Sequence, residues 1–185
     1  NLYEVPVGGG APVALTQSTT DSIYAIGYFP KDGRLLYTAD QGGNELNHVY
    51  VREADGTVKD LTPGDKHKAQ FGGWADDDQS FFVMTNERDE RYFDAYEYAV
   101  DGYARTLMYK NEKGYFPGAI SRDKRHIALG KVNTTSDSDI VLFDRESNEE
   151  KNLTQHEGVE SNESVAFTPD GALLYTSNRG GEFSR

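Results

Sequence analysis

The sequence predicts an all-β fold, a β-propeller built from four-stranded antiparallel blades. One turn motif recurs along the whole chain with a period of about 46 residues. Each period holds four short runs of β-branched or aromatic residues, and no helical periodicity persists for ten residues. A unit of roughly 40–50 residues with four strands has the length of a propeller blade.

Three columns of residues keep this period. The turn segments "FPKDGR", "WADDDQ", "ISRDKR" and "FTPDGA" align on an acidic residue, at steps of 45, 46 and 47: Asp32, Asp77, Asp123 and Asp170. A second column steps by 46 each time: Leu15-Thr16, Leu61-Thr62, Leu107-Met108 and Leu153-Thr154. A third column has the same step: Tyr50, Tyr96 and Leu142. An ordinary β-sandwich does not require the same turn residues at a fixed period, so the propeller is favoured.

The strands of the first complete unit are predicted as "IYAIGYF", "RLLYTA", "HVYVRE" and "TVKDLT". Lys-Asp-Gly joins the first pair and Ala-Asp-Gly the last pair, and both are tight-turn sequences because glycine accepts positive φ. The second unit repeats the plan with "QFGGWA", "SFFVMT", "DAYEYAV" and "ARTLMY". The third does so with "FPGAIS", "HIALGK", "DIVLFD" and "EKNLTQ".

The period divides the chain into a half blade at 1–16, blades at about 17–63, 64–110 and 111–156, and a half blade at 157–185. "RGGEFSR" aligns with "QGGNELN" at an offset of 138 residues, so both ends fall between a second and a third strand. In one interpretation the half blades pair and close a ring, within one chain or in a homodimer, which protects both edges. In the other, compatible interpretation the chain is a protease-resistant piece of a longer propeller.

Composition excludes several classes of function. The chain has 31 acidic and 19 basic residues and a net charge of −12, which disfavours a nucleic-acid partner. It has no cysteine, so it has neither a disulfide framework nor a thiol nucleophile, and the compartment stays open. No apolar run approaches the roughly 18 residues of a membrane helix, so no membrane span is predicted.

Two segments carry a resemblance to a known repeat. "FTPDGALLYTSNRGG" and "FPKDGRLLYTADQGGNELNHVYVREADGTVKDLT" resemble the blades of TolB-type propellers, with their aromatic-Ser-Pro-Asp-Gly turn and closing Leu-Thr. The same repeat occurs in the N-terminal propeller of prolyl-oligopeptidase-family serine peptidases. "DQGGNELNHVYVRE", "NERDERYFDAYEY" and "NTTSDSDIVLFDRE" are most similar to bacterial peptidase members. The resemblance covers all 185 residues, although "ADDDQ" and "SRDKR" depart from the Pro-Asp-Gly turn.

The resemblance is specific for the fold and less so for function, because TolB and several lyases and hydrolases share the repeat. It implies a non-catalytic domain that gates or orients peptide substrates for a separate α/β-hydrolase domain. The partners implied are a peptide substrate or that hydrolase domain, with a periplasmic or secreted location favoured over a cytoplasmic one. The chain contains no Gly-x-Ser-x-Gly motif, so no catalytic residue is carried over. The alternatives are a TolB-like protein-interaction propeller without enzymatic activity and a metal-dependent sugar-acid lyase.

The candidate binding surface is the set of loops after each second strand. Loops on a rigid scaffold often carry binding residues, and these loops gather on one face of a propeller. Their charges have both signs, so a binding face and a solvated polar rim both remain open. We call the following set the rim residues: Asp40, Glu45, Glu87, Arg88, Asn133, Arg179 and Glu182.

The residues that could hold a cofactor favour structural roles, so neither a metal nor a cofactor is predicted. The histidines share no column and no short spacing: His48, His67, His126 and His156. Calcium needs six to eight oxygen ligands, and two acidic groups could offer some: Asp76 to Asp78, and Asp137 with Asp139. The turn column explains Asp77, and Ser136 and Ser138 are interpreted as turn residues. No Lys-Ser/Thr follows the glycines at 8–10, which disfavours a phosphate loop.

Overall fold

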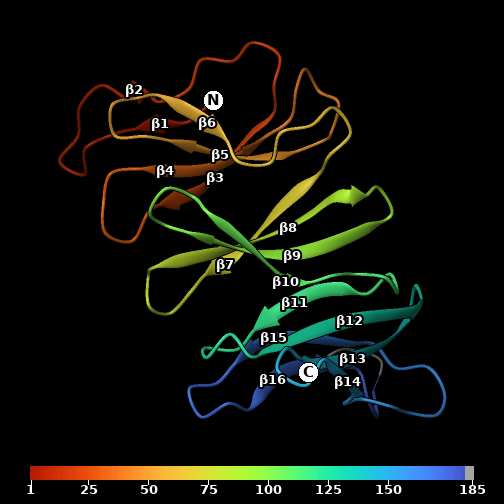
Figure 1. Ribbon diagram of the computed structural model, residues 1–185. Helices are drawn as coiled ribbons and strands as arrows, with labels where there is room; N and C mark the ends of the chain where they lie inside the picture. Colours follow the sequence, from red (N-terminus) through yellow and green to blue (C-terminus); the bar gives the residue numbers. More distant parts are fainter. Residues whose placement is uncertain (182–185) are drawn as a thin grey trace.

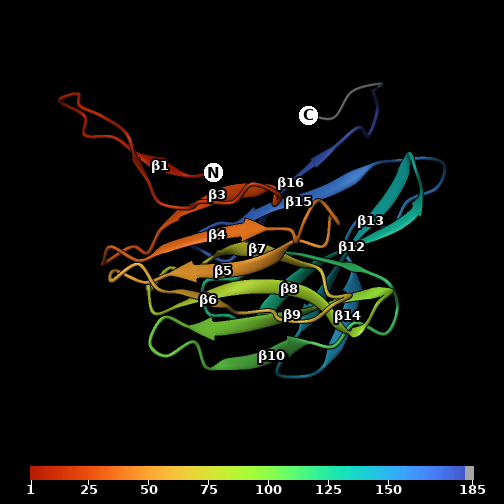
Figure 2. The ribbon, with the colours of Figure 1, turned by 90° about the horizontal axis from the view of Figure 1, so that it is seen from above.

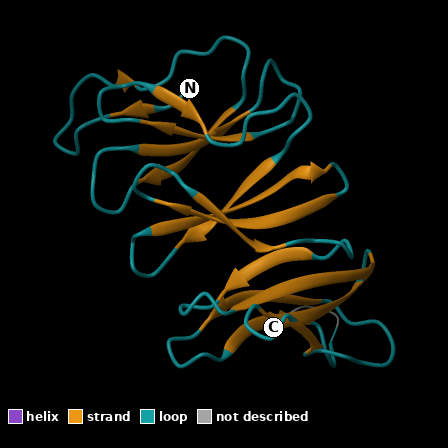
Figure 3. Cartoon of the chain, viewed as in Figure 1, coloured by secondary structure: helices purple, strands orange, loops and turns teal. Residues whose placement is uncertain are grey.

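The computed structural model describes residues 1–181, and these residues form sixteen β-strands in five antiparallel sheets. The three four-stranded sheets follow one another in sequence order from the top to the bottom of Figure 1, and the last hairpin overlaps the third of them in this view. Strands and loops account for all of the described part of the chain (Figure 3). No helix among the described residues is long and apolar enough to cross a membrane.

Each sheet takes its strands from consecutive stretches of sequence. The first hairpin pairs β1 (Tyr3–Glu4) with β2 (Val13–Ala14). The first full sheet contains β3 (Ile23–Tyr28), β4 (Leu35–Ala39), β5 (His48–Arg52) and β6 (Val58–Asp60). The second contains β7 (Ala69–Trp74), β8 (Ser80–Asp89), β9 (Tyr92–Ala99) and β10 (Arg105–Tyr109). The third contains β11 (Phe116–Ile120), β12 (His126–Thr134), β13 (Asp137–Asp144) and β14 (Glu149–Asn152). The last hairpin pairs β15 (Asn162–Phe167) with β16 (Leu173–Ser177).

The strand order confirms the predicted fold class. In each full sheet, neighbouring strands in the sheet are also neighbours in the sequence, as in β3-β4-β5-β6. Such four-stranded meanders, repeated side by side, are the blades of a propeller. Figure 2, seen from above, shows this order of the strands from β3 to β6 in the first full sheet and from β7 to β10 in the second.

The recurring aspartate of the first turn has one local function in the three full sheets. Its Oδ1 atom accepts a hydrogen bond from the backbone N–H two residues later, which closes an Asx turn. The distance is 2.9 Å from Arg34 to Asp32, 2.8 Å from Gln79 to Asp77, and 3.0 Å from Arg125 to Asp123. The acid is therefore repeated because the turn between the first two strands needs it.

The threonine of the Leu-Thr column closes the outer edge of a sheet. Its hydroxyl accepts a hydrogen bond from a backbone N–H at the third strand, at 3.0 Å from Val49 to Thr62 and 2.7 Å from Ile140 to Thr154. In the first hairpin the N–H of Leu2 donates to Thr16 in the same way, at 2.8 Å. The second sheet has a methionine at this position, and a different set of contacts closes its edge, as described below.

Alternating side chains of the middle sheet build two cores. Phe81 and Val83 of β8 are completely buried in the core shared with the first sheet. Phe82, between them in sequence, lies in the core shared with the third sheet. A strand buried on both faces supplies side chains to both neighbours because successive residues point in opposite directions. This explains why the sequence "SFFVMT" is apolar without a polar interruption.

The two terminal hairpins form separate two-stranded sheets. Pairing of the half blades within one chain, one of the expected modes of closure, is thus absent from the described residues. Pairing between two chains remains a prediction. On the second strand of the first sheet Leu36 is fully buried, whereas Leu174, at the equivalent position of the last hairpin, is 56% exposed. The difference arises because the last hairpin has a packed sheet on one face only.

Candidate functional site

The rim residues lie after or at the ends of the second strands, but not all of them are in loops. Asp40 and Glu45 follow β4, and Arg179 follows β16. Glu87 and Arg88 belong to β8, and Asn133 belongs to β12, because the ladders with the third strands continue as far as Asp89 and Thr134. The expectation that all of these residues are loop residues is therefore wrong for three of them. Glu182 lies outside the described residues.

The Asp40 side chain binds the backbone just before the first strand of its own sheet. The backbone N–H of Ser22, just before β3, donates to Asp40 Oδ1 at 2.7 Å, and the Asp40 carboxylate is almost completely buried. This hydrogen bond is the main reason that the pKa of Asp40 lies below its ordinary value. The carboxylate that was a candidate ligand group is thus already engaged by backbone N–H groups.

The same clasp occurs in two other sheets with asparagine in place of aspartate. The N–H of Lys68 donates to Asn86 Oδ1 at 2.6 Å, and the N–H of Ser161 donates to Asn178 Oδ1 at 2.8 Å. The positions 40, 86 and 178 are one and two repeat periods apart, so the sequence did contain this column. The column is hard to recognise in the sequence because the third sheet has Val132 at that position and the residue type changes between the others.

Arg88 closes the edge of the second sheet, where the threonine is missing. Its guanidinium contacts the completely buried Asp94 of β9 through two parallel bonds, of 2.7 and 2.8 Å. Nη2 also donates to the backbone carbonyl of Asn111 at 2.5 Å. The partner of Glu87 is Arg105, at 2.7 Å. The paired bonds between the Arg88 guanidinium and the Asp94 carboxylate belong to the strongest class of hydrogen bonds in proteins.

Asn111, after β10, joins the second sheet to the third. Its side-chain nitrogen donates to the carbonyls of Phe93 and Tyr115, and its Oδ1 accepts from the N–H of Gly114 at 2.9 Å. Its own N–H donates to Asp94 Oδ1 at 2.7 Å. We call Arg88, Asp94 and Asn111 the Arg88 junction.

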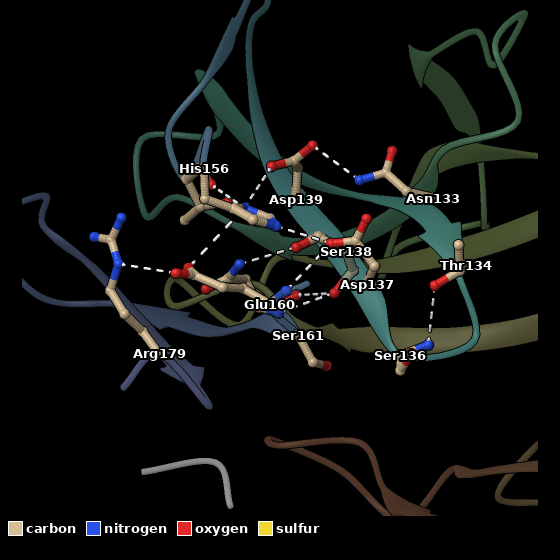
Figure 4. Close-up of polar contacts among 12 residues, drawn as sticks. Asn133, Thr134, Ser136, Asp137, Ser138, Asp139, His156, Glu160, Ser161 and Arg179 are labelled. Carbon is tan, nitrogen blue, oxygen red and sulfur yellow. Dashed lines mark hydrogen bonds and ion pairs between the residues drawn. The ribbon is translucent and has the colours of Figure 1, made fainter. Parts of the chain in front are cut away.

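A second set of polar side chains links the third full sheet to the last hairpin (Figure 4). His156 lies in the connection between β14 and β15, and its side chain is 4% exposed. Its Nε2 lies 2.8 Å from Asp137 Oδ1, and its Nδ1 lies 2.8 Å from the carbonyl oxygen of Thr154. Asp139 Oδ1 lies 3.3 Å from Nδ1, and Glu160 Oε2 lies 4.0 Å from it. We call Asp137, Asp139, His156 and Glu160 the His156 cluster.

Two rim residues converge on this cluster. Asn133 donates from Nδ2 to Asp139 Oδ2 at 3.2 Å, and Arg179 contacts Glu160 at 3.2 Å (Figure 4). Three rim residues of the first two full sheets are instead bonded within those sheets: Asp40, Glu87 and Arg88. The structure therefore brings together Asn133 and Arg179, and not the whole predicted set.

The ionisation of the cluster is coupled. The Thr154 carbonyl and then the Asp137 carboxylate raise the pKa of His156 above its ordinary value. His156 in turn lowers the pKa of Asp137. Burial opposes the charge of Asp139, but Asn133 and Lys131 outweigh it and lower the pKa of this carboxyl. Sequence reasoning had considered Asp137 and His156 separately, and no spacing signal linked them.

The other histidines have partners of their own. His48 is buried, and its Nδ1 lies 2.7 Å from Asp60 Oδ2; the Nδ1 of His67 lies 3.0 Å from the Pro63 carbonyl. His126 Nε2 lies 3.7 Å from Asp144. Within residues 1–181, no group of three or more histidine, cysteine or acidic side chains is arranged to hold a metal ion.

A hollow of about 320 Å³ lies between the first hairpin and the first full sheet. Asp40 lines it together with the stacked rings of Tyr37 and Tyr50, whose centroids are 5.3 Å apart. Burial raises the pKa of Tyr37 to about 12, so its phenol stays protonated at neutral pH. The hollow thus offers aromatic surface and hydroxyl groups.

Comparison with known proteins places these features in context. No protein-family model matches the chain. A dipeptidyl aminopeptidase, BIII from Pseudoxanthomonas mexicana, is 35% identical over 101 residues, which are 54% of this chain and 15% of that protein. The chain thus spans a small part of the length of the relative that it matches.

Three solved structures show the fold. A prolyl endopeptidase superposes with a TM-score of 0.69 at 15% identity, covering 99% of this chain and 30% of its own. An oligogalacturonate lyase in complex with manganese superposes with a TM-score of 0.67 at 13% identity, covering 97% and 51%. A putative TolB from Agrobacterium tumefaciens superposes with a TM-score of 0.56 at 20% identity, covering 92% and 59%.

The structural matches establish the fold, and the sequence match points to one group among the proteins that share it. Both agree with the resemblance read from the repeat. The chain has the fold of a TolB-type β-propeller, and over 101 residues its sequence is similar to that of a dipeptidyl aminopeptidase.

Proposed function

We propose that this chain is part of the propeller of a serine peptidase and that it gates or orients peptide substrates for a hydrolase domain elsewhere in the protein. The observation that carries the proposal is the 35% identity to a dipeptidyl aminopeptidase over 101 residues. The likeness in fold to a prolyl endopeptidase is consistent with it.

The geometry of the rim supports a role based on shape more than on charge. Asp40, Arg88 and Arg179 are all engaged by partners within the fold. Glu45 differs from them: its side chain is exposed, and its φ of 61° lies in the left-handed region. We therefore expect Glu45, in the first full sheet, to make a charged contact with a peptide, whereas Asp40, Arg88 and Arg179 stabilise the sheets around it.

The complete gene provides the first test. We expect a Gly-x-Ser-x-Gly motif and a Ser-Asp-His triad downstream of this segment. The complete protein should release dipeptides from chromogenic substrates, and the serine-to-alanine variant of its hydrolase domain should not. The purified 185-residue chain should be inactive. A gene without a hydrolase domain, or hydrolysis by the purified chain, would refute the peptidase assignment.

Gating needs a separate test in the complete protein. Shortening the loop at 41–46 should raise catalytic efficiency for a long peptide relative to a dipeptidyl substrate, because the loop narrows the entrance. The E45K variant keeps the loop length and serves as the matched control for charge. If the ratio of the two efficiencies is unchanged in the shortened variant, this loop does not gate.

A TolB-like protein-interaction propeller without enzymatic activity is the second candidate. The superposition on a putative TolB over 92% of this chain favours it. It predicts a gene without a hydrolase domain and a stable complex with a partner protein. The gene sequence thus separates the two functions before any assay is made.

A further inference from the structure

The geometry around His156 defines its charge. The two groups closest to its ring nitrogens are a carbonyl oxygen, that of Thr154, and a carboxylate oxygen, that of Asp137, each at 2.8 Å. A carbonyl or an ionised carboxylate can only accept a hydrogen bond. Both nitrogens must therefore carry a hydrogen to satisfy the two contacts, which makes the ring an imidazolium cation.

The charged groups around the ring also indicate that His156 is protonated. Three carboxylates surround it: Asp137 and Asp139 from β13, and Glu160 from the segment before β15. Two further cations lie behind them, Lys131 of β12 at 3.2 Å from Asp139, and Arg179 at 3.2 Å from Glu160. The charges balance only when His156 is protonated.

Asp139 gives independent support. Its side chain is 7% exposed, and its Oδ1 atom is buried without a hydrogen-bond donor. His156 Nδ1 lies 3.3 Å from this oxygen. A buried carboxylate oxygen without a donor is costly, and the positive charge of the ring offsets that cost.

The cluster spans the boundary between the third full sheet and the last hairpin. Asp137 Oδ1, which contacts His156, also accepts the backbone N–H of Glu160 at 3.3 Å. Beside it, Ser138 donates its N–H to the Glu160 carbonyl at 2.8 Å and its hydroxyl to the Asn162 carbonyl at 2.9 Å. Asn162 returns a bond from its Nδ2 to the Ser138 carbonyl at 2.9 Å.

We propose that His156 is a proton-dependent clasp, which in its charged form holds the β15–β16 hairpin against β13 and on losing its proton releases it. Without the proton, one ring nitrogen faces an oxygen without a hydrogen between them, and three carboxylates face two cations. The bonds of Ser138 and Asn162 then hold the hairpin without the charge that draws the carboxylates together, so they open more often.

The direction of the pH dependence follows from the sign of the shift. The pKa of His156 is raised in the folded chain. Its contribution to stability is therefore fully present below the ordinary pKa of histidine, and it is lost as the pH rises through the raised value. Release belongs to the neutral-to-alkaline side, and not to acid.

The test is amide hydrogen exchange of the full chain between pH 6 and pH 9, corrected for the intrinsic pH dependence of exchange. The N–H groups of Ser138, Glu160 and Asn162 should lose protection as the pH rises. The N–H of Asn111, at the Arg88 junction, is the internal control and should keep its protection. Nitrogen-15 NMR of the imidazole should show both nitrogens of His156 protonated at pH 6.

The H156Q variant should show low protection at these amides at every pH, and the H67Q variant, which changes the histidine bonded to Pro63, should behave like the parent. If H156Q does not fold, the D137N variant gives the same information, because it should lower the pH at which protection is lost. A neutral ring at pH 6, unchanged protection up to pH 9, or an equal loss at Asn111 would each overturn the proposal.

Discussion

The Arg88 junction and the His156 cluster solve the same problem at successive boundaries of the propeller. Each supplies a cation to buried carboxylates of a third strand, β9 in one case and β13 in the other. In the first, the cation is an arginine, which stays charged at any pH that a protein survives. In the second, it is a histidine, whose charge depends on pH near neutrality. One boundary is thus permanently fixed, and the other is conditional.

The two sites also differ in how the neighbouring sheet is held. At the Arg88 junction, one fully buried side chain, Asn111, bridges backbone groups of the second sheet and the chain leading to the third. At the His156 cluster, Ser138 and Asn162 exchange bonds across the boundary. The comparison indicates that the stability of a boundary between two sheets depends on whether its cation is an arginine or a histidine. Four substitutions test this.

The largest effect is expected for D94A. It leaves the guanidinium of Arg88 without its carboxylate and the N–H of Asn111 without its acceptor. Removing one partner of a buried pair costs about 3–5 kcal/mol, and the partial exposure of Arg88 places this case near the lower end, at about 3 kcal/mol. Urea denaturation should give the same loss at pH 6 and pH 9.

The E112Q variant is the control for D94A, because it removes an exposed ion pair with Lys110 from a nearby surface and should leave stability unchanged. A D94A loss below about 1 kcal/mol would show that water replaces the carboxylate.

The next effect is that of N111A, which removes a side chain that is 1% exposed and makes several hydrogen bonds. We expect a loss of about 2 kcal/mol in the free energy of unfolding, because the carbonyl of Phe93 and the N–H of Gly114 are left without partners. The N111D variant keeps the acceptor but places a buried carboxylate oxygen against the carbonyls of Phe93 and Tyr115, so its loss should be larger than that of N111A. A smaller loss for N111D than for N111A would place most of the contribution in the bonds that Oδ1 accepts.

A smaller effect is expected for R88K, at about 1 kcal/mol, because lysine keeps the charge but lacks the fork that binds both oxygens of Asp94. The R88H variant places a histidine at the Arg88 junction, so that this boundary depends on a histidine cation as the His156 cluster does. Its stability relative to the parent should fall as the pH rises from 6 to 9, whereas that of R88K should not change. A flat profile for R88H would mean that the cation at this site does not set the strength of the boundary.

The smallest effect is that of R179Q. Arg179 is a mostly exposed partner of Glu160, and its removal leaves His156 as the principal cation near that carboxylate. The pKa of His156 should therefore rise slightly further, which an NMR titration of the ring measures. The R122Q variant, which removes an exposed arginine paired with Asp76, should leave this titration unchanged.

Much of the fold was predictable because its signals are local. The aspartates of the turn column bond to a backbone N–H two residues away, as Asp32 does, so a short window of sequence is sufficient to define the turn. The continuous apolar run at 81–84 in β8 is likewise a local pattern, typical of a strand that is buried on both faces. The Leu-Thr column persists because Thr62 and Thr154 each close a sheet edge.

The sequence predicted where the rim residues lie along the chain, but it did not predict which side chains they contact. The sequence placed Arg88 and Asn133 near the ends of second strands, where they lie, but called them loop residues because it did not define where β8 and β12 end. The ladder extends these strands when the opposing residues keep pairing, and that depends on the register with the third strand. Glu182 lies outside the described residues.

The sequence by itself determined the repeat, the strands, the turns and the class of fold, because each depends on residues close together in the chain. Only the tertiary structure decided that Asp94 is buried against Arg88 and that three carboxylates surround His156. Those contacts join different strands and different sheets, and their energies depend on burial and on hydrogen-bond geometry. Neither quantity is encoded in any one segment, so neither the permanent boundary nor the conditional one could be recognised before the sheets were placed side by side.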